Sequence, residues 1–125
     1  MKSNINISER KPVWKALSEL YLDNELQDST YSYMVAKFVK SPYDFNEIKY
    51  INRYEVFPVL YRNLLSVAGE WAGFEEQWLI RTITNRFNKK NLWTTLNDKA
   101  AYFLYHKMYK KDWEILKAVY DQTKN

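Results

Sequence analysis

The sequence predicts an all-α fold, a single compact domain of six or seven short helices, from three observations. Apolar residues recur every three or four positions along most of the chain, which places them on one face of a helix. Only two glycines and three prolines occur in 125 residues, too few for the turns of a many-stranded sheet. A chain of this length buries one hydrophobic core. We therefore expect a flexible N-terminus at 1–7 and one helical domain at 8–125.

The first two helices are predicted from cap residues and a terminating proline. Ser8 is a candidate N-cap, and Pro12 fits the first turn of a helix, where no backbone N–H is needed. Asp28 or Ser29 is expected to cap the second helix. This helix should stop at Ser41-Pro42, because the residue before a proline is driven out of helical dihedrals.

The central helices are expected to meet at a corner at 68–74. Asp44 and Glu47 have the spacing of a capping box and predict the start of the third helix. Pro58 interrupts the helical pattern, so a kink or a new start is expected near 56–57. Gly69 lies where the next helix would end, because glycine enters the left-handed conformation of a C-cap without steric cost.

The rest of the chain is expected to form helices packed against this corner. A fifth helix should run from Phe74 to Phe87. Asn97-Asp98 offers a cap for a sixth helix, which continues through 100–109. Asp112 is the expected cap of a final helix, so the last third predicts two separate helices.

Composition excludes several classes of protein. The chain has no cysteine, so disulfides, thiolate catalysis and cysteine zinc sites are absent. No run of apolar residues is long enough to cross a membrane, and the first residues lack the apolar core of a secretory signal. We therefore expect a cytoplasmic protein that does not bind membranes.

Charge is distributed unevenly along the chain. Residues 1–80 carry nine Lys and Arg against eleven Asp and Glu, whereas residues 81–125 carry ten against four. The formal net charge of the whole chain is +4. Two interpretations of the basic last third stay open. The lysines complement the C-terminal ends of helices and are solvated there, or they attract nucleic acid or an acidic protein surface.

Candidate catalytic residues are few. His106 is the only histidine, so no histidine metal site is expected, and a single imidazole beside apolar residues is more often structural. Glu55 and Glu70 each interrupt an apolar stretch and together would supply a base if they shared a pocket. The alternative, which we favour, is that each is paired with Arg53, Arg62 or backbone amides. The sequence therefore predicts a protein that is not an enzyme and has no metal or cofactor.

Tyrosine is unusually abundant, with eleven residues. Tyr102, Tyr105 and Tyr109 recur at helical spacing and form one stripe, while Phe103, Leu104 and Met108 lie around the other side. Such a helix is either covered on most sides or presents tyrosines to a partner.

Three motifs carry a resemblance to a known family. They are RKPVW at 10–14, YEVFPVL at 54–60 and NLLSVAGEWAGF at 63–74. The pattern resembles a family of small bacterial proteins without an assigned activity. Some relatives resemble immunity proteins of contact-dependent growth inhibition systems, which bind and neutralise the toxic nuclease domain of a sibling effector. The similarity covers the first two-thirds of the chain.

The resemblance implies a protein-binding module that neutralises a cognate toxin domain sterically, without a small-molecule substrate. The residues expected to bind this partner are Glu70, Trp71, Phe74, Tyr102, Tyr105 and Tyr109. The basic charge argues against inhibition of a basic nuclease, unless the toxin presents an acidic face or inserts against the acidic residues 1–80. An RNA- or ribosome-associated adaptor that uses the basic C-terminal third is the alternative function.

Overall fold

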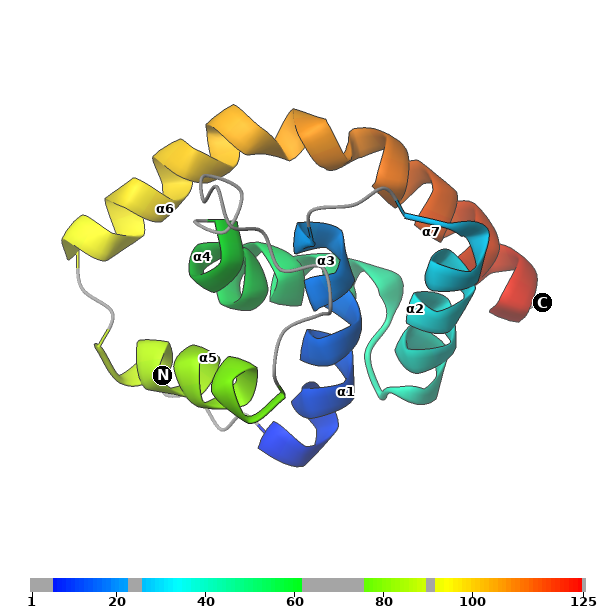
Figure 1. The fold of residues 1–125 in the computed structure, drawn as a ribbon, viewed down its shortest axis with the longest axis horizontal. Coiled ribbons are helices and arrows are strands. Elements are labelled where there is room, and N and C mark those ends of the chain that lie inside the picture. Colours follow the sequence, from blue (N-terminus) through cyan, green and yellow to red (C-terminus); the bar gives the residue numbers. More distant parts are fainter. Residues whose placement is uncertain (1–5, 23–25, 62–75, 90–91, 125) are drawn as a thin grey trace.

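The structure is a computed structural model that describes residues 6–22, 26–61, 76–89 and 92–124 (Figure 1). Its elements are α1 (Ile7–Leu17), the 3-10 helix η1 (Ser18–Tyr21), α2 (Asp28–Lys40), α3 (Phe45–Ile51), the π-helix η2 (Asn52–Val56), α4 (Phe57–Leu60), α5 (Glu76–Lys89), α6 (Leu92–Tyr105), the 3-10 helix η4 (His106–Tyr109) and α7 (Lys110–Lys124). No strand occurs in these ranges. The predicted all-α fold class is therefore confirmed for the described residues.

The number of helices differs from the prediction. Counted as uninterrupted runs, the described residues form five helices, because η1 follows α1 directly, α3, η2 and α4 follow one another directly, and so do α6, η4 and α7. The expected break before Asp112 is absent, since no glycine or proline occurs between Leu92 and Lys124. Asp98 lies inside α6, where it pairs with Arg86 of α5, and neither aspartate is an N-cap.

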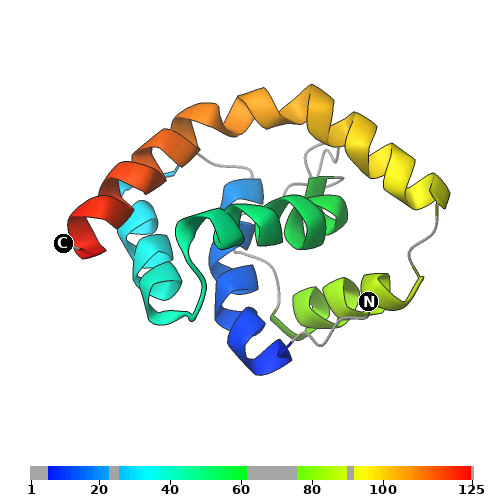
Figure 2. The ribbon, with the colours of Figure 1, turned by 180° about the vertical axis from the view of Figure 1, so that it is seen from behind.

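Helix α1 lies at the centre of the molecule. It contacts α2, α5 and η2, and α2 packs in turn against α7. Figures 1 and 2 show α6 and α7 as an arch along one side of the molecule, with the α3–α4 run beneath it. Tyr31 of α2 donates a hydrogen bond of 2.6 Å to the Asp112 carboxylate, which joins the arch to the body of the fold.

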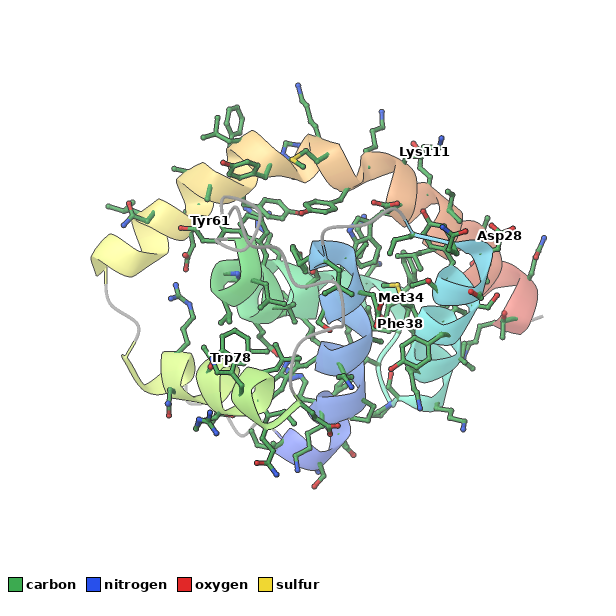
Figure 3. All side chains as sticks on the ribbon, in the orientation of Figure 1. Asp28, Met34, Phe38, Tyr61, Trp78 and Lys111 are labelled. Carbon is green, nitrogen blue, oxygen red and sulfur yellow. The ribbon has the colours of Figure 1, made fainter. Side chains whose placement is uncertain are left out.

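One hydrophobic core connects these helices. Trp14 and Leu17 of α1 are fully buried, and Met34 and Phe38 lie on the side of α2 that faces α1 (Figure 3). The other side chains that are almost completely buried come from α3, α4, α5 and α7, and include Ile48, Ile51, Phe57, Leu60, Leu79, Ile83 and Leu116. The described residues thus share a single core.

Local signals fix several helix ends. Asp44 and Glu47 form the predicted capping box at the start of α3. Helix α2 ends at Lys40 with Ser41 in an extended conformation, as the Ser41-Pro42 pair predicts. The predicted cap at Ser8 is wrong, because the Asn6 side chain accepts the bond from the backbone N–H of Glu9.

Other boundaries also depart from the predictions. Asp28 lies in the first turn of α2, and Gln27 is the N-cap residue. Near Pro58, where a kink or a new start was expected, the helix changes from the π-helix η2 to α4 at Phe57 without ending. The backbone N–H of Phe57 donates to the carbonyl oxygen of Asn52, five residues back, and Pro58 lies in the first turn of α4, where its missing N–H is tolerated. The predicted corner at 68–74 lies outside the described residues.

Among the described residues, no helix combines the length and the apolar character that a membrane span requires.

Candidate functional site

The outward side of α6 and η4 carries large apolar side chains that no described helix covers. Its members recur at helical spacing and are exposed: Leu96, Ala100, Phe103, Leu104 and Met108. Phe103 is 75% exposed and Leu104 is 71% exposed, although residues of both types are normally buried. Lys99 and Lys107 are exposed between them. We call these five apolar residues the outer face, and contiguous exposed apolar residues of this kind are typical of binding surfaces.

The tyrosine stripe lies on the inward side of the same helices. The ring of Tyr102 packs edge-on against Phe57 at 5.2 Å, and the ring of Tyr109 lies 5.3 Å from that of Tyr21. Tyr105 lies 6.4 Å from Tyr61, which Figure 3 places beneath α6. Tyr109 is only 7% exposed, and Tyr102 and Tyr105 are partly buried.

These positions bear on the residues expected to bind a partner. Burial of Tyr109 leaves almost none of its side chain open to another protein, because its ring is part of the core. Tyr102 and Tyr105 keep a partial exposure beside the outer face. Glu70, Trp71 and Phe74 lie outside the described residues. Of the six residues expected to bind a partner, the described structure therefore places the three tyrosines together, and they lie on the side of the helix that faces the core.

A groove of about 970 Å³ opens between α3 and the arch, in the size range of ligand-binding clefts. Residues of α3, α6, η4 and α7 line it: Phe45, Asn46, Lys49, Tyr102, His106, Lys107, Lys110, Trp113, Glu114 and Lys117. Four of these are lysines and one is a carboxylate, so the groove attracts anions. We call it the basic groove.

Aromatic rings form the apolar wall of the basic groove. Phe45 and Trp113 pack edge-to-face with their ring centres 5.6 Å apart. The ammonium group of Lys49 lies over Trp113 and that of Lys117 lies over Phe45, each at 5.9 Å. These contacts stabilise the lysines without neutralising their charge.

His106 lies at one wall of the groove. Its Nδ1 lies 3.1 Å from the backbone carbonyl oxygens of Tyr102 and Phe103. Carbonyl oxygens only accept hydrogen bonds, so Nδ1 is the donor in these contacts. The imidazole stacks on Tyr102 with 5.6 Å between ring centres.

Glu55 is held in a buried polar cluster. Its carboxylate accepts a 2.8 Å hydrogen bond from Trp14 Nε1 and forms a 3.2 Å ion pair with Arg10. Nearby in η2, Asn52 accepts a 2.6 Å bond from the Tyr21 hydroxyl. Glu55 is thus a paired residue, as favoured from the sequence, but its described ionic partner is Arg10 rather than Arg53.

The ionisation of two core tyrosines predicts a pH dependence of stability. Burial, then the neighbouring Tyr109, raises the pKa of Tyr21 well above its ordinary 10.0. Burial, followed by Asp112, likewise raises the pKa of Tyr109. The folded protein therefore holds these protons more tightly than the unfolded chain does. The contribution of these two groups to the free energy of unfolding is fully present below about pH 10. It falls as the pH rises from there toward the folded-state pKa values.

Urea unfolding measured from neutral pH to above about pH 10 tests this expectation. The double variant Tyr21→Phe, Tyr109→Phe should lose less stability over the alkaline range than the wild type does. Tyr50→Phe is the control, because Tyr50 is 58% exposed. An equally steep alkaline loss in the double variant would show that other groups cause it.

No group of three or more potential metal ligands occurs among the described residues.

Of the two surfaces, the sequence indicated only the outer face. The outer face was visible as the second side of the helix at 100–109, whereas the basic groove was not, because Lys49 lies far from Lys107 in sequence. The only available signal for the groove was the excess of lysine in the last third.

A comparison with known families gives one further finding. A family model described as "Domain of unknown function (DUF7079)" matches residues 8–119. The matched range includes the outer face and every residue that lines the basic groove. No curated protein and no solved structure matches the chain.

Proposed function

Because the chain belongs to the DUF7079 family, whose description assigns no activity, we propose its function from its described surface: it is an immunity protein that binds a bacterial toxin domain through the outer face of α6 and η4. The observation that supports this most directly is the exposure of Phe103, Leu104 and Met108 on one helix face. The immunity role itself comes from the sequence resemblance, and the exposed apolar side chains support the outer face as the contact surface.

The outer face has the features of a protein-binding surface. Phe103 and Leu104 offer adjacent apolar side chains on a regular helix, so little backbone conformational entropy is lost when a partner packs against them. Met108 adds a flexible side chain that adapts to the shape of a partner. An exposed aromatic side chain such as Phe103 becomes buried when a partner binds, and aromatic anchors of this kind contribute a large share of the binding energy at protein interfaces.

The charges around the outer face specify the partner further. Lys99 and Lys107 lie within it, and Lys110 and Lys111 follow at its C-terminal end, all of them exposed. Figure 3 shows Lys111 on the outer edge of α7. No described acidic residue pairs with any of these four lysines. The toxin surface that fits is therefore apolar at its centre and acidic at its rim, which accounts for a basic immunity protein.

Co-expression with a genomic neighbour tests this function. The partner is the C-terminal domain of a large secreted effector encoded immediately upstream. We expect the wild type to restore growth and to co-purify with this domain. Phe103→Ser should lower the affinity about 30-fold or more and reduce rescue, because it removes an exposed apolar anchor without changing charge.

Tyr33→Ser is the matched control for this experiment. Tyr33 is an exposed aromatic residue on α2, away from the outer face, and its replacement should leave rescue intact. Circular dichroism checks that both variants fold. Rescue by Phe103→Ser at the wild-type level, or toxicity of the effector domain without any complex, would contradict the proposal.

A further inference from the structure

The basic groove and the residues beside it form a second surface, which has only Lys107 and Lys110 in common with the toxin-binding proposal. Three described elements bring its lysines together: Lys49 from α3, Lys107 from η4, and Lys110 and Lys117 from α7. The groove faces α3, whereas the outer face has no described helix over it. The two surfaces share Lys107 and Lys110 in their surroundings but differ in their apolar residues.

Three of the four groove lysines have no acidic partner in the described part of the chain. Lys117 forms a 2.8 Å ion pair with Asp121, whereas no described carboxylate pairs with Lys49, Lys107 or Lys110. Lys110 and Lys117 are two helical turns apart on α7, about 10 Å along its axis. Such a spacing fits several negative charges in a row better than one isolated anion.

A stacked series of side chains leads from the groove across η2 to α3. The imidazole of His106 stacks on Tyr102, and the guanidinium of Arg53 lies over Tyr102 at 4.6 Å and over Tyr54 at 5.1 Å. The ring of Tyr54 lies 4.7 Å from that of Tyr50. The two last tyrosines are 38% and 58% exposed, respectively, so parts of their rings are open to solvent.

From this arrangement we infer that the basic groove and the stacked series bind single-stranded nucleic acid. The lysines hold consecutive phosphates, and Tyr50 and Tyr54 stack on unpaired bases. Proteins that bind single strands without sequence preference combine these same two features, a cationic groove and exposed aromatic rings beside it. A duplex offers phosphates but no free base faces, and an acidic peptide offers carboxylates but no aromatic bases. The exposed tyrosine pair therefore favours the single strand.

Fluorescence anisotropy of a labelled oligouridylate of about ten nucleotides measures this binding in the full chain. A plot of the logarithm of the binding affinity against the logarithm of the salt concentration should have a slope of about −3, as expected for four lysine–phosphate contacts. Lys49→Gln and Lys110→Gln should each bring this slope closer to zero by about 0.7. The matched control is Lys11→Gln, because Lys11 is exposed on α1 and does not line the groove.

The tyrosine pair gives a second and independent readout. Tyr54→Ala should weaken binding by about 5- to 100-fold while the salt slope stays at its wild-type value, because stacking involves no released counterion. If this variant loses fold, Tyr50→Ala serves instead, since Tyr50 is the more exposed of the two. Tyr33→Ala, an exposed tyrosine on α2, should have no effect.

Three results would overturn the inference. The first is no change of anisotropy at low salt. The second is an equal effect of Lys11→Gln and Lys49→Gln, which would mean diffuse charge attraction. The third is a combined result: polyglutamate competes as effectively as unlabelled oligouridylate does, and Tyr54→Ala leaves the affinity unchanged. This combination would assign the groove to an acidic peptide. Phe103 does not line the groove, so the Phe103→Ser variant should bind the oligouridylate with wild-type affinity. The same variant tests toxin binding, so the two proposals can fail independently.

Discussion

Replacing Phe57 with alanine is expected to lower the free energy of unfolding by about 3–5 kcal/mol, because it removes the ring that joins three parts of the core. Phe57 is 1% exposed. Its ring stacks on Tyr61 at 5.0 Å, meets the edge of Tyr102 at 5.2 Å and lies 6.2 Å from Tyr21. The truncation leaves a cavity at the contact between α4, η1 and α6.

Phe103→Ala makes the same chemical change on the other side of α6. Phe103 is 75% exposed, so its truncation should change stability by less than about 0.5 kcal/mol. Urea unfolding of both variants measures the difference. Similar losses in the two variants would mean that the inward and outward sides of α6 are assigned incorrectly.

Replacing Glu55 with glutamine is expected to destabilise the protein by about 3 kcal/mol. The substitution keeps the size of the side chain but removes the charge that faces Arg10, whose side chain is 15% exposed while that of Glu55 is 3% exposed. The glutamine amide also brings new donors toward Trp14 Nε1, which is itself a donor. Breaking one half of a buried ion pair leaves the other charge without compensation.

Glu76→Gln is the matched control for this variant. The Glu76 side chain is 58% exposed and lies 4.0 Å from Lys15, so its loss should change stability by less than about 1 kcal/mol. Urea unfolding at neutral pH measures both variants. A loss in Glu55→Gln no larger than that in Glu76→Gln would show that the Arg10–Glu55 pair does not stabilise the fold.

Short-range signals in the sequence predicted several helix ends correctly. The side chains of Asp44 and Glu47 each accept a hydrogen bond from the other residue's backbone N–H, and Pro42 acts on the residue next to it. The prediction at Ser8 failed because two residues of similar capping preference, Asn6 and Ser8, lie close together in the chain. Local preference does not distinguish them, and α1 begins early enough for Ile7 to pack against the core.

The continuity of helices was harder to predict. Pro58 was expected to produce a kink or a new start, and the chain accommodates it by the π-helix η2. Asp112 has a good capping side chain, but it accepts a hydrogen bond from Tyr31 of α2 instead. A tertiary contact of this kind, between residues far apart in sequence, is not visible in a local pattern.

The two sides of α6 illustrate a further limit. Both sides are apolar in sequence, so periodicity locates two stripes without saying which one faces the core. Hydropathy alone would bury Phe103 and Leu104 and expose the tyrosines, whereas Tyr109 is buried and Phe103 is exposed. The difference arises from aromatic partners on η1 and α4, which only the folded chain brings together. The basic groove could not be predicted for the same reason, because α3 supplies one of its walls.

Oxidation of methionine tests the central claim, that the outer face binds the toxin domain, most directly. Met108 is 58% exposed and Met34 is completely buried, so hydrogen peroxide should oxidise Met108 much faster in the free protein. In the complex with the upstream effector domain, followed by mass spectrometry, we expect Met108 to become protected while Met34 stays unreactive. Undiminished oxidation of Met108 in a stable complex would contradict the claim.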